Sequence, residues 1–319
     1  MRLKVEGVGN YHCMSRVVGG QMLLGKLEKE VFRKQLWRQV DFCGLDLLTY
    51  CVMGNHFHLL VRVRDEVEVD NTELIRRVEC LYGKENVYSH FVRSILTDEC
   101  NVGLESVRAQ LLARMNSVSN FMKELKQRFS IWYNKTHERY GTLWADRFKS
   151  VLVENKQYAL ETVAAYIDLN PLRAGLVDDP RDYRFSGYGE AMGGSVFARS
   201  GIIAFMDGGN WADCVAGYRQ LIYGKGAIDQ SGNQISIDSK TFKETLSNGG
   251  SVHKSEALRC RVRYFTDGLI LGGQQFIADT VANNKGALGN RGSLSGKKMS
   301  GSDWGGMLSY RDLRKDVFL

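Results

Sequence analysis

The sequence predicts an α+β fold: a ferredoxin-like antiparallel sheet with helices packed on one face, followed by a glycine-rich C-terminal extension. The first observation is that the period of the apolar residues alternates between values typical of strands and of helices, in the order β-α-β-β-α-β-α. The second is a change of composition, because residues 1–180 hold 11 glycines and residues 181–319 hold 23. We therefore expect a first domain over residues 1–190 and an extension over residues 191–319.

The first four elements follow from short-range patterns. Residues 11–18 form an apolar run that stops at a pair of glycines, which is typical of a strand. Residues 28–42 carry apolar side chains at helical spacing, and Gly44 is a stop signal. Residues 45–53 and 56–63 are two β-rich runs, and Gly54-Asn55 between them predicts a hairpin.

Three further elements complete the domain. Residues 105–138 predict a long helical stretch, either continuous or broken in two. Residues 142–153 predict a further strand. Residues 156–170 predict a helix that ends at Pro171, because the residue before a proline disfavours the helical region.

Composition and charge restrict the class of protein. Apolar residues make up 44% of the 319 and charged residues 25%, the mix of a soluble globular protein. The net charge is +7 and the pI is near 9.0, which favours polyanions as partners. No apolar run approaches the roughly 18 residues of a membrane span. The first residues lack the apolar core of a signal peptide, so we expect a cytoplasmic protein. Its seven cysteines include no CxxC pair, which indicates reduced thiols.

Two histidines on the second strand of the hairpin form a candidate metal site. Side chains at i and i+2 of a strand share one face, so His56 and His58 project together while Phe57 points the other way, toward the core. Imidazole is the commonest metal ligand in proteins. Two alternatives stay open from these residues alone: a solvated strand face without a metal, and a structural zinc site that also uses Cys51.

A metal that activates a phosphate needs a nucleophile and a third protein ligand beside it. Tyr166 and Asn170 lie four residues apart on a predicted helix, so both can face one site. The amide oxygen suits a hard cation such as Mg²⁺ or Mn²⁺, and the phenol is a candidate nucleophile. Tyr133 and His137 have the same spacing, and spacing alone does not separate the two pairs. A tyrosine packed in the core with a hydrogen-bonded hydroxyl is the third alternative.

Residues 121–150 combine positive charge with aromatic rings. They hold seven basic side chains against three acidic ones. Positive charge follows a phosphate backbone, and flat rings stack on unpaired bases. The helical spacing of Phe121, Phe129 and Trp132 indicates instead that these three rings belong to the core. The residues expected to bind nucleic acid are Lys123, Lys126, Arg128, Lys135, Arg139, Arg147 and Lys149.

With these motifs in order, the sequence resembles the REP-associated tyrosine transposases, part of the single-tyrosine HUH endonuclease and IS200-like transposase superfamily. The resemblance covers roughly residues 8–190. The histidine pair alone is a weak signal, but with the downstream Tyr-Ile-x-x-Asn-Pro it is fairly specific. The segments that carry the resemblance are Tyr11-His12-Cys13-Met14-Ser15-Arg16, Met53-Gly54-Asn55-His56-Phe57-His58-Leu59-Leu60, Phe121-Met122-Lys123, Gly141-Thr142-Leu143-Trp144, Arg147-Phe148-Lys149-Ser150 and Tyr166-Ile167-Asp168-Leu169-Asn170-Pro171.

The resemblance implies a metal-dependent nuclease and strand transferase that cuts single-stranded DNA beside a hairpin. It assigns His56, His58 and Asn170 as ligands of a divalent metal, Mg²⁺ or Mn²⁺. It assigns Tyr166, in preference to Tyr133, as the nucleophile that becomes joined to the 5′-phosphate and leaves a free 3′-hydroxyl. These roles come from the family and not from spacing.

The resemblance also bears on the rest of the chain. Residues 64–104 resemble an insertion, and residues 263–268 resemble an extension of longer family members. The basic, glycine-rich extension suggests additional DNA contact. We expect a monomer or a homodimer. The alternative function is a non-catalytic nucleic-acid-binding regulator that retains the fold, but a pure binder has no need of the complete His, His, Tyr and Asn set.

Overall fold

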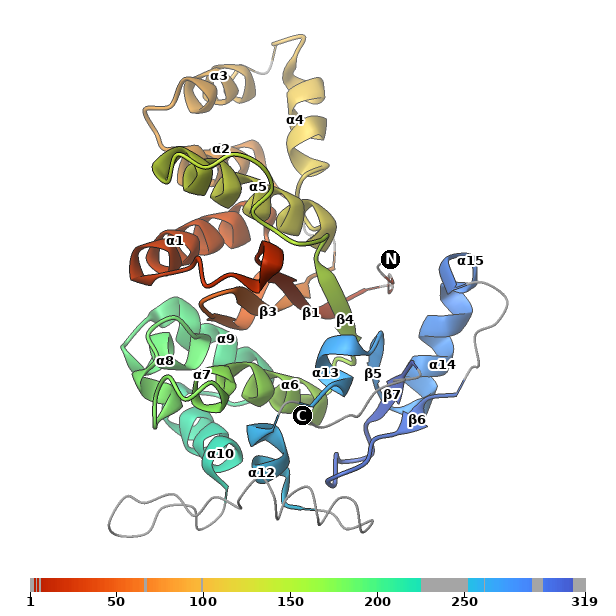
Figure 1. Ribbon diagram of the computed structural model, residues 1–319. Coiled ribbons are helices and arrows are strands. Elements are labelled where there is room, and N and C mark those ends of the chain that lie inside the picture. The colour runs from red at the N-terminus through yellow and green to blue at the C-terminus, as the bar shows by residue number, and fades with distance from the viewer. Residues whose placement is uncertain are drawn as a thin grey trace.

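The structure is a computed structural model that describes residues 3, 5, 7–65, 68–98, 100–224, 252–260, 262–288 and 295–311 (Figure 1). Its strands are β1 (Gly9–Arg16), β2 (Asp46–Val52), β3 (His56–Val63), β4 (Lys149–Val153), β5 (Ile270–Gly272), β6 (Lys297–Lys298) and β7 (Leu308–Tyr310). Its α-helices are α1 (Lys26–Cys43), α2 (Asn71–Tyr82), α3 (Val87–Leu96), α4 (Leu104–Leu112), α5 (Val118–Thr136), α6 (Gln157–Asp168), α7 (Asn170–Arg173), α8 (Gly187–Met192), α9 (Val196–Met206), α10 (Trp211–Tyr223), α12 (Lys254–Arg259), α13 (Tyr264–Asp267), α14 (Gln274–Asn283) and α15 (Lys285–Leu288).

The described strands form one mixed sheet in the order β2-β3-β1-β4-β5-β7-β6. Strand β1 lies between β3 and β4 and is antiparallel to both, and β2 is antiparallel to β3. The elements up to α6 follow the predicted order, with α2 and α3 inserted after β3. The helical stretch predicted over residues 105–138 is broken in two, into α4 and α5. The α+β class is therefore confirmed, and the narrower ferredoxin-like description stays a prediction.

The predicted hairpin is present, and the predicted last strand of the domain is shorter. Strands β2 and β3 are joined by Met53, Gly54 and Asn55, and the Met53 N–H donates to the His56 carbonyl at 2.8 Å. Of the predicted strand over residues 142–153, only Lys149–Val153 joins the sheet. The apolar residues before it leave the sheet because Trp144 turns into the core and makes a single bridge to Val17.

Helices α1 and α5 cover one face of the sheet through an aromatic cluster. The Phe57 ring of β3 lies 4.7 Å, centroid to centroid, from Phe32 of α1 and 5.3 Å from Trp144. Phe129 of α5 lies 5.1 Å from Phe32. The predicted core positions are confirmed for Phe57, Phe121 and Phe129, whereas Trp132 is only half-buried.

The opposite face of the sheet is covered by α6, α8 and α9 (Figure 1). The prediction of helices on one face only is therefore wrong. Helix α9 lies so close to β2 that a Cβ atom added to Gly201 would be 2.4 Å from the Leu47 carbonyl oxygen. All residues of β2 after Asp46 are buried, which is the pattern of a strand with helices on both faces.

A buried carboxylate connects four elements within this second layer. Asp168, the last residue of α6, accepts hydrogen bonds from the Thr49 hydroxyl at 2.9 Å, the Tyr218 hydroxyl at 2.6 Å and the Tyr188 backbone N–H at 3.1 Å. Burial raises the pKa of Asp168 to about 7, although each hydrogen bond acts to lower it. Because its partners lie on β2, α10 and α8, one side chain fixes all three to α6.

Residues after 190 add strands β5, β7 and β6 to this sheet, and their helices α9 and α10 pack in the same layer as α6. Strand β5 is parallel to β4, and β7 and β6 follow in antiparallel order. The division at residue 190 stays a prediction. Within the predicted insertion, α2 packs against α1 and α3 packs against α2, at the end of the molecule remote from α6 (Figure 1). No helix in the described ranges has both the length and the apolar character needed to cross a membrane.

Candidate active site

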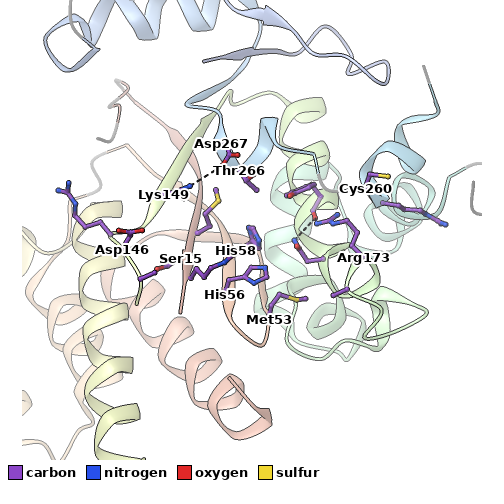
Figure 2. A pocket seen from close by; sticks show the side chains of 18 residues that line it. Ser15, Met53, His56, His58, Asp146, Lys149, Arg173, Cys260, Thr266 and Asp267 are labelled. Carbon is purple, nitrogen blue, oxygen red and sulfur yellow. Dashed lines mark hydrogen bonds and ion pairs between the residues drawn. The ribbon is translucent and has the colours of Figure 1, made fainter. Parts of the chain in front are cut away.

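A cavity of about 600 Å³ lies where β1, β3 and the residues before β4 meet the α6–α7 junction, α12 and α13 (Figure 2). The structure brings all four predicted active-site residues, His56, His58, Tyr166 and Asn170, to the wall of this cavity. More basic than acidic side chains line it, so it attracts anions. The acidic residues are Asp146 and Asp267, and the basic ones are Arg16, Arg147, Lys149, Arg173 and Arg259.

Strand β3 presents His56 and His58 on the face opposite Phe57, with their ring centroids 5.1 Å apart. The Asn55 amide nitrogen donates to the Gly20 carbonyl at 2.9 Å, which leaves the amide oxygen facing Nδ1 of His56 at 2.6 Å. Because that oxygen can only accept, Nδ1 of His56 carries the hydrogen. His58 Nδ1 lies 2.9 Å from Nε2 of His12. Each ring thus contacts the protein through Nδ1, so Nε2 is the atom through which it would bind a metal.

Tyr166 lies on α6, and its ring centroid is 6.3 Å from that of His58. The residue is only 2% exposed. The Arg173 guanidinium lies 4.2 Å from the centroid of the phenol ring and also donates to the Tyr166 carbonyl at 2.7 Å. The Phe265 ring, from α13, is 4.8 Å from the same phenol. The candidate nucleophile therefore contacts both a cation and an aromatic ring, beside the histidine pair.

Asn170 begins α7, directly after the end of α6. Its side-chain nitrogen donates to the carbonyl oxygens of Tyr166 at 3.2 Å and Ile167 at 3.0 Å, so it caps the last turn of α6. These bonds orient the amide with its nitrogen toward the helix. Because Asn170 also lines the cavity, its side-chain oxygen is the atom that a cation in the cavity would contact.

The rival candidate Tyr133 lies elsewhere, as does Tyr158, another tyrosine of α6. Tyr133 is stacked on His137 with ring centroids 4.2 Å apart, and Nε2 of His137 lies 3.1 Å from the Glu28 carboxylate. The Tyr158 hydroxyl donates to Glu154 at 2.9 Å. Neither tyrosine lines the cavity that contains Tyr166.

The predicted nucleic-acid-binding residues divide by position. Arg147 and Lys149 line the cavity, and Lys126 lies next to it because its Nζ donates to the Asp146 carbonyl at 2.7 Å. Burial lowers the pKa of Lys126 to about 8. Arg128 instead stacks on the Tyr82 ring and borders a separate surface hollow. The remaining three, Lys123, Lys135 and Arg139, are not among the cavity residues.

Sequence reasoning did not single out His12 and Arg173. His12 lies on β1, and a polar residue within that apolar run was the feature of the sequence that could have indicated a functional role. Burial, together with the Arg173 charge, lowers the pKa of His12 to about 4, although the hydrogen bond to the Phe265 carbonyl raises it. Arg173 lies beyond Pro171, where the predicted helix ends, so no spacing in the sequence connected it with Tyr166.

The donors in the cavity fit a Mn²⁺ or Mg²⁺ site better than a structural zinc site. Within the described ranges, no three His, Cys, Asp or Glu side chains are grouped to hold a metal ion. Cys51 is fully buried, and its thiol contacts the Met53 sulfur at 3.5 Å, so it does not complete a zinc site. The cavity instead offers two imidazoles and one amide oxygen, a donor set that fits Mn²⁺ or Mg²⁺ with further positions for water and phosphate.

Comparison with known proteins agrees with the sequence resemblance. Residues 109–170 match the family of IS200-like transposases, a segment that contains Tyr166 and Asn170 and ends before Arg173. The chain is thus similar to IS200-like transposases, and the resemblance is confirmed over this segment. A solved structure described as a REP-associated tyrosine transposase bound to a REP hairpin is also similar, at 14% identity and a TM-score of 0.39, over 62% of this chain and 88% of that one. No curated protein matches the sequence.

Proposed function

We propose that the protein is a metal-dependent transposase that nicks and joins single-stranded DNA through a tyrosine nucleophile, at sites beside a DNA hairpin. The observation that carries the proposal is the convergence of His56, His58, Tyr166 and Asn170 on one cavity from two separate segments of the chain. Each of these side chains has a role in phosphodiester cleavage, and a site that only bound DNA would not require their combination.

His56, His58 and Asn170 would hold a divalent metal. The fit rests on the orientation of the donors, since both imidazoles contact the protein through Nδ1 and the Asn170 nitrogen faces the helix. A bound Mg²⁺ or Mn²⁺ would supply Lewis-acid polarisation of the scissile phosphate.

The remaining steps belong to the protein side chains. The Tyr166 oxygen attacks phosphorus, the new O–P bond forms, and the bond from phosphorus to the 3′ oxygen breaks. The phenol loses its proton to solvent, and the departing 3′ oxygen takes up a proton to become a hydroxyl. The 5′-phosphotyrosine retains the energy of the phosphodiester, so a later attack by a 3′-hydroxyl restores DNA without an external energy source. Arg173 and the basic residues of the cavity wall would bind the phosphates and orient them.

The test is formation of a covalent protein–DNA adduct. The full chain is incubated with a single-stranded oligonucleotide that contains a hairpin, with Mn²⁺, and the adduct is detected on a denaturing gel. We expect Tyr166→Phe to abolish the adduct and Tyr133→Phe, the matched control, to leave it. Mass spectrometry of the DNA-linked peptide should identify Tyr166. An adduct that persists in Tyr166→Phe, or a linked peptide from another segment, would refute the assignment.

One observation favours the alternative, a non-catalytic nucleic-acid-binding regulator. Tyr166 is 2% exposed and covered by Phe265, so attack requires the DNA to reach a phenol that is almost enclosed. Under this alternative, hairpin DNA would bind equally to the wild type and to His56→Ala, and no metal-dependent cleavage would occur.

A further inference from the structure

Three residues from distant parts of the chain form a continuous hydrogen-bonded line behind the histidine pair. His58 Nδ1 lies 2.9 Å from His12 Nε2, and His12 Nδ1 lies 2.9 Å from the carbonyl oxygen of Phe265. His12 is completely buried and His58 nearly so. The line runs from α13 through β1 to β3, and it ends at a residue on the cavity wall.

The chemistry of the Phe265 carbonyl fixes the direction of both hydrogen bonds. A carbonyl oxygen only accepts, so Nδ1 of His12 must carry a hydrogen. In the neutral His12 ring the other nitrogen, Nε2, is then an acceptor. His58 must donate to it from Nδ1, and Nε2 of His58 therefore holds the lone pair.

We propose that His12 is a positioning residue that transmits the polarity of the Phe265 carbonyl to His58 and holds His58 in the tautomer able to bind a metal through Nε2. The role in metal binding rests on the proposed function, whereas the directions of the two hydrogen bonds do not depend on it. It also gives residue 265 of the C-terminal extension a role at the active site, through its backbone. Metal-binding histidines commonly have the second ring nitrogen held by a hydrogen bond, and losing such a partner weakens metal binding by about 10- to 100-fold.

His12 itself is not placed to be a ligand. Both of its ring nitrogens already have partners, and its side chain is not among those that line the cavity. A histidine that merely filled space in the core would not need one ring nitrogen bonded to a carbonyl and the other to a second imidazole. The arrangement therefore indicates an influence on His58 and no direct contact with DNA or metal.

The first experiment determines the tautomers directly and requires no metal and no activity. The full chain is labelled with ¹⁵N at its histidine rings and examined by NMR in EDTA, with His90, whose side chain is 60% exposed, as the solvent reference. We expect hydrogen on Nδ1 and a lone pair on Nε2 for both His12 and His58. Assignment uses the loss of single signals in His12→Gln and His58→Gln. Hydrogen on Nε2 of His58 would overturn the inference, whatever the protein does with metal.

The second experiment measures Mn²⁺ affinity by calorimetry for the wild type, His12→Leu and His12→Gln. Leucine removes both hydrogen bonds, whereas the glutamine oxygen can reach the position of Nε2 and accept from His58. We expect about 10- to 100-fold weaker binding in His12→Leu and recovery of most of the affinity in His12→Gln. Circular dichroism and hairpin-DNA binding check that both variants are folded. Equal affinity in all three proteins would overturn the inference and leave the proposed function intact.

The two proposals fail in different ways. A wild type that shows the expected tautomers but binds no Mn²⁺ would refute the metal-dependent function and support the hydrogen-bonded line. A wild type that binds Mn²⁺ and forms the Tyr166 adduct, with His58 in the other tautomer, would support the function and refute the role of His12.

Discussion

Asp168 makes the stability of this protein depend on pH in an unusual direction. The carboxyl group is completely buried, and its hydrogen-bond donors, the hydroxyls of Thr49 and Tyr218 and the backbone N–H of Tyr188, are all neutral. Burial therefore dominates and raises the pKa from 3.8 to about 7. A raised carboxyl pKa means that the folded state favours the protonated form, so folding is more favourable at low pH with respect to this group.

The size of the effect follows from the shift. The stabilising contribution is fully present below about pH 4, falls as the pH rises toward about 7, and is constant above that. A difference of about 3 pKa units at 1.36 kcal/mol each corresponds to about 4 kcal/mol. Asp168→Asn removes the charge, and its imperfect replacement of the hydrogen bonds costs about 1–2 kcal/mol. We therefore expect the variant to be about 2–3 kcal/mol more stable than the wild type at about pH 8.5 and less stable by about 1–2 kcal/mol at about pH 4.

The assay is urea unfolding of both proteins across this pH range, in EDTA so that no metal contributes. The difference in unfolding free energy between variant and wild type should change sign within the range. Tyr218→Phe is the control, because it removes a hydrogen bond that lowers the Asp168 pKa, so the loss of stability should extend to higher pH than in the wild type. A difference that stays constant with pH would show that Asp168 does not titrate in this range and would refute the reasoning.

Three further predictions concern the core and the cavity. Phe57→Ala, which empties the centre of the aromatic cluster, should lower the unfolding free energy by about 3–5 kcal/mol in urea unfolding, and a loss under about 1 kcal/mol would contradict the packing. Alanine at both Arg147 and Lys149 should reduce the slope of log binding constant against log salt concentration for single-stranded DNA by about 1.4, measured by fluorescence anisotropy. Arg128→Ala, outside the cavity, should leave this slope unchanged. Equal slopes in all proteins would exclude the cavity as the path of the phosphates. Arg173→Met should slow adduct formation by tenfold or more because it removes the charge beside the Tyr166 phenol, and an unchanged single-turnover rate would show that this charge does not assist the reaction.

Local patterns in the sequence predict the elements well, because strand and helix periods depend on neighbouring residues. The alternation at residues 56–58 places two imidazoles on one face and Phe57 on the other, as the structure has them. The same reasoning overextends β4, since the apolar residues before Lys149 fit a strand pattern but pack in the aromatic cluster. It also misses the second helical layer. The nearly continuous apolar run of β2 could have indicated this layer, because a strand covered on both faces is buried along its length.

The surroundings of the site depend on contacts that no local pattern contains. The hydrogen bond between His12 and the Phe265 carbonyl spans 253 positions, and the one between Arg173 and the Leu258 carbonyl spans 85. The DNA-binding residues predicted on α5 from its basic charges have the same limitation, because the direction in which each side chain points depends on tertiary contacts. Arg128 lies on that helix but stacks on Tyr82, away from the cavity, because the helix presents its basic residues in several directions.

The residues after 190 act on the site through the fold, and this restricts how their role can be tested. Strand β5 pairs with β4, and the N–H of Glu154, directly after β4, donates to the Leu271 carbonyl at 2.8 Å, so without β5 one side of β4 would be an unpaired edge. Helix α9 covers β2, Tyr218 holds Asp168, and the Phe265 carbonyl orients His12. A fragment that ends at residue 190 would lose all four contacts at once. If such a fragment lacked the proposed DNA cleavage, this would therefore not show that the extension touches DNA. Only substitutions on exposed basic residues of the extension, with the sheet and the His12 line intact, can separate DNA contact from support of the active site.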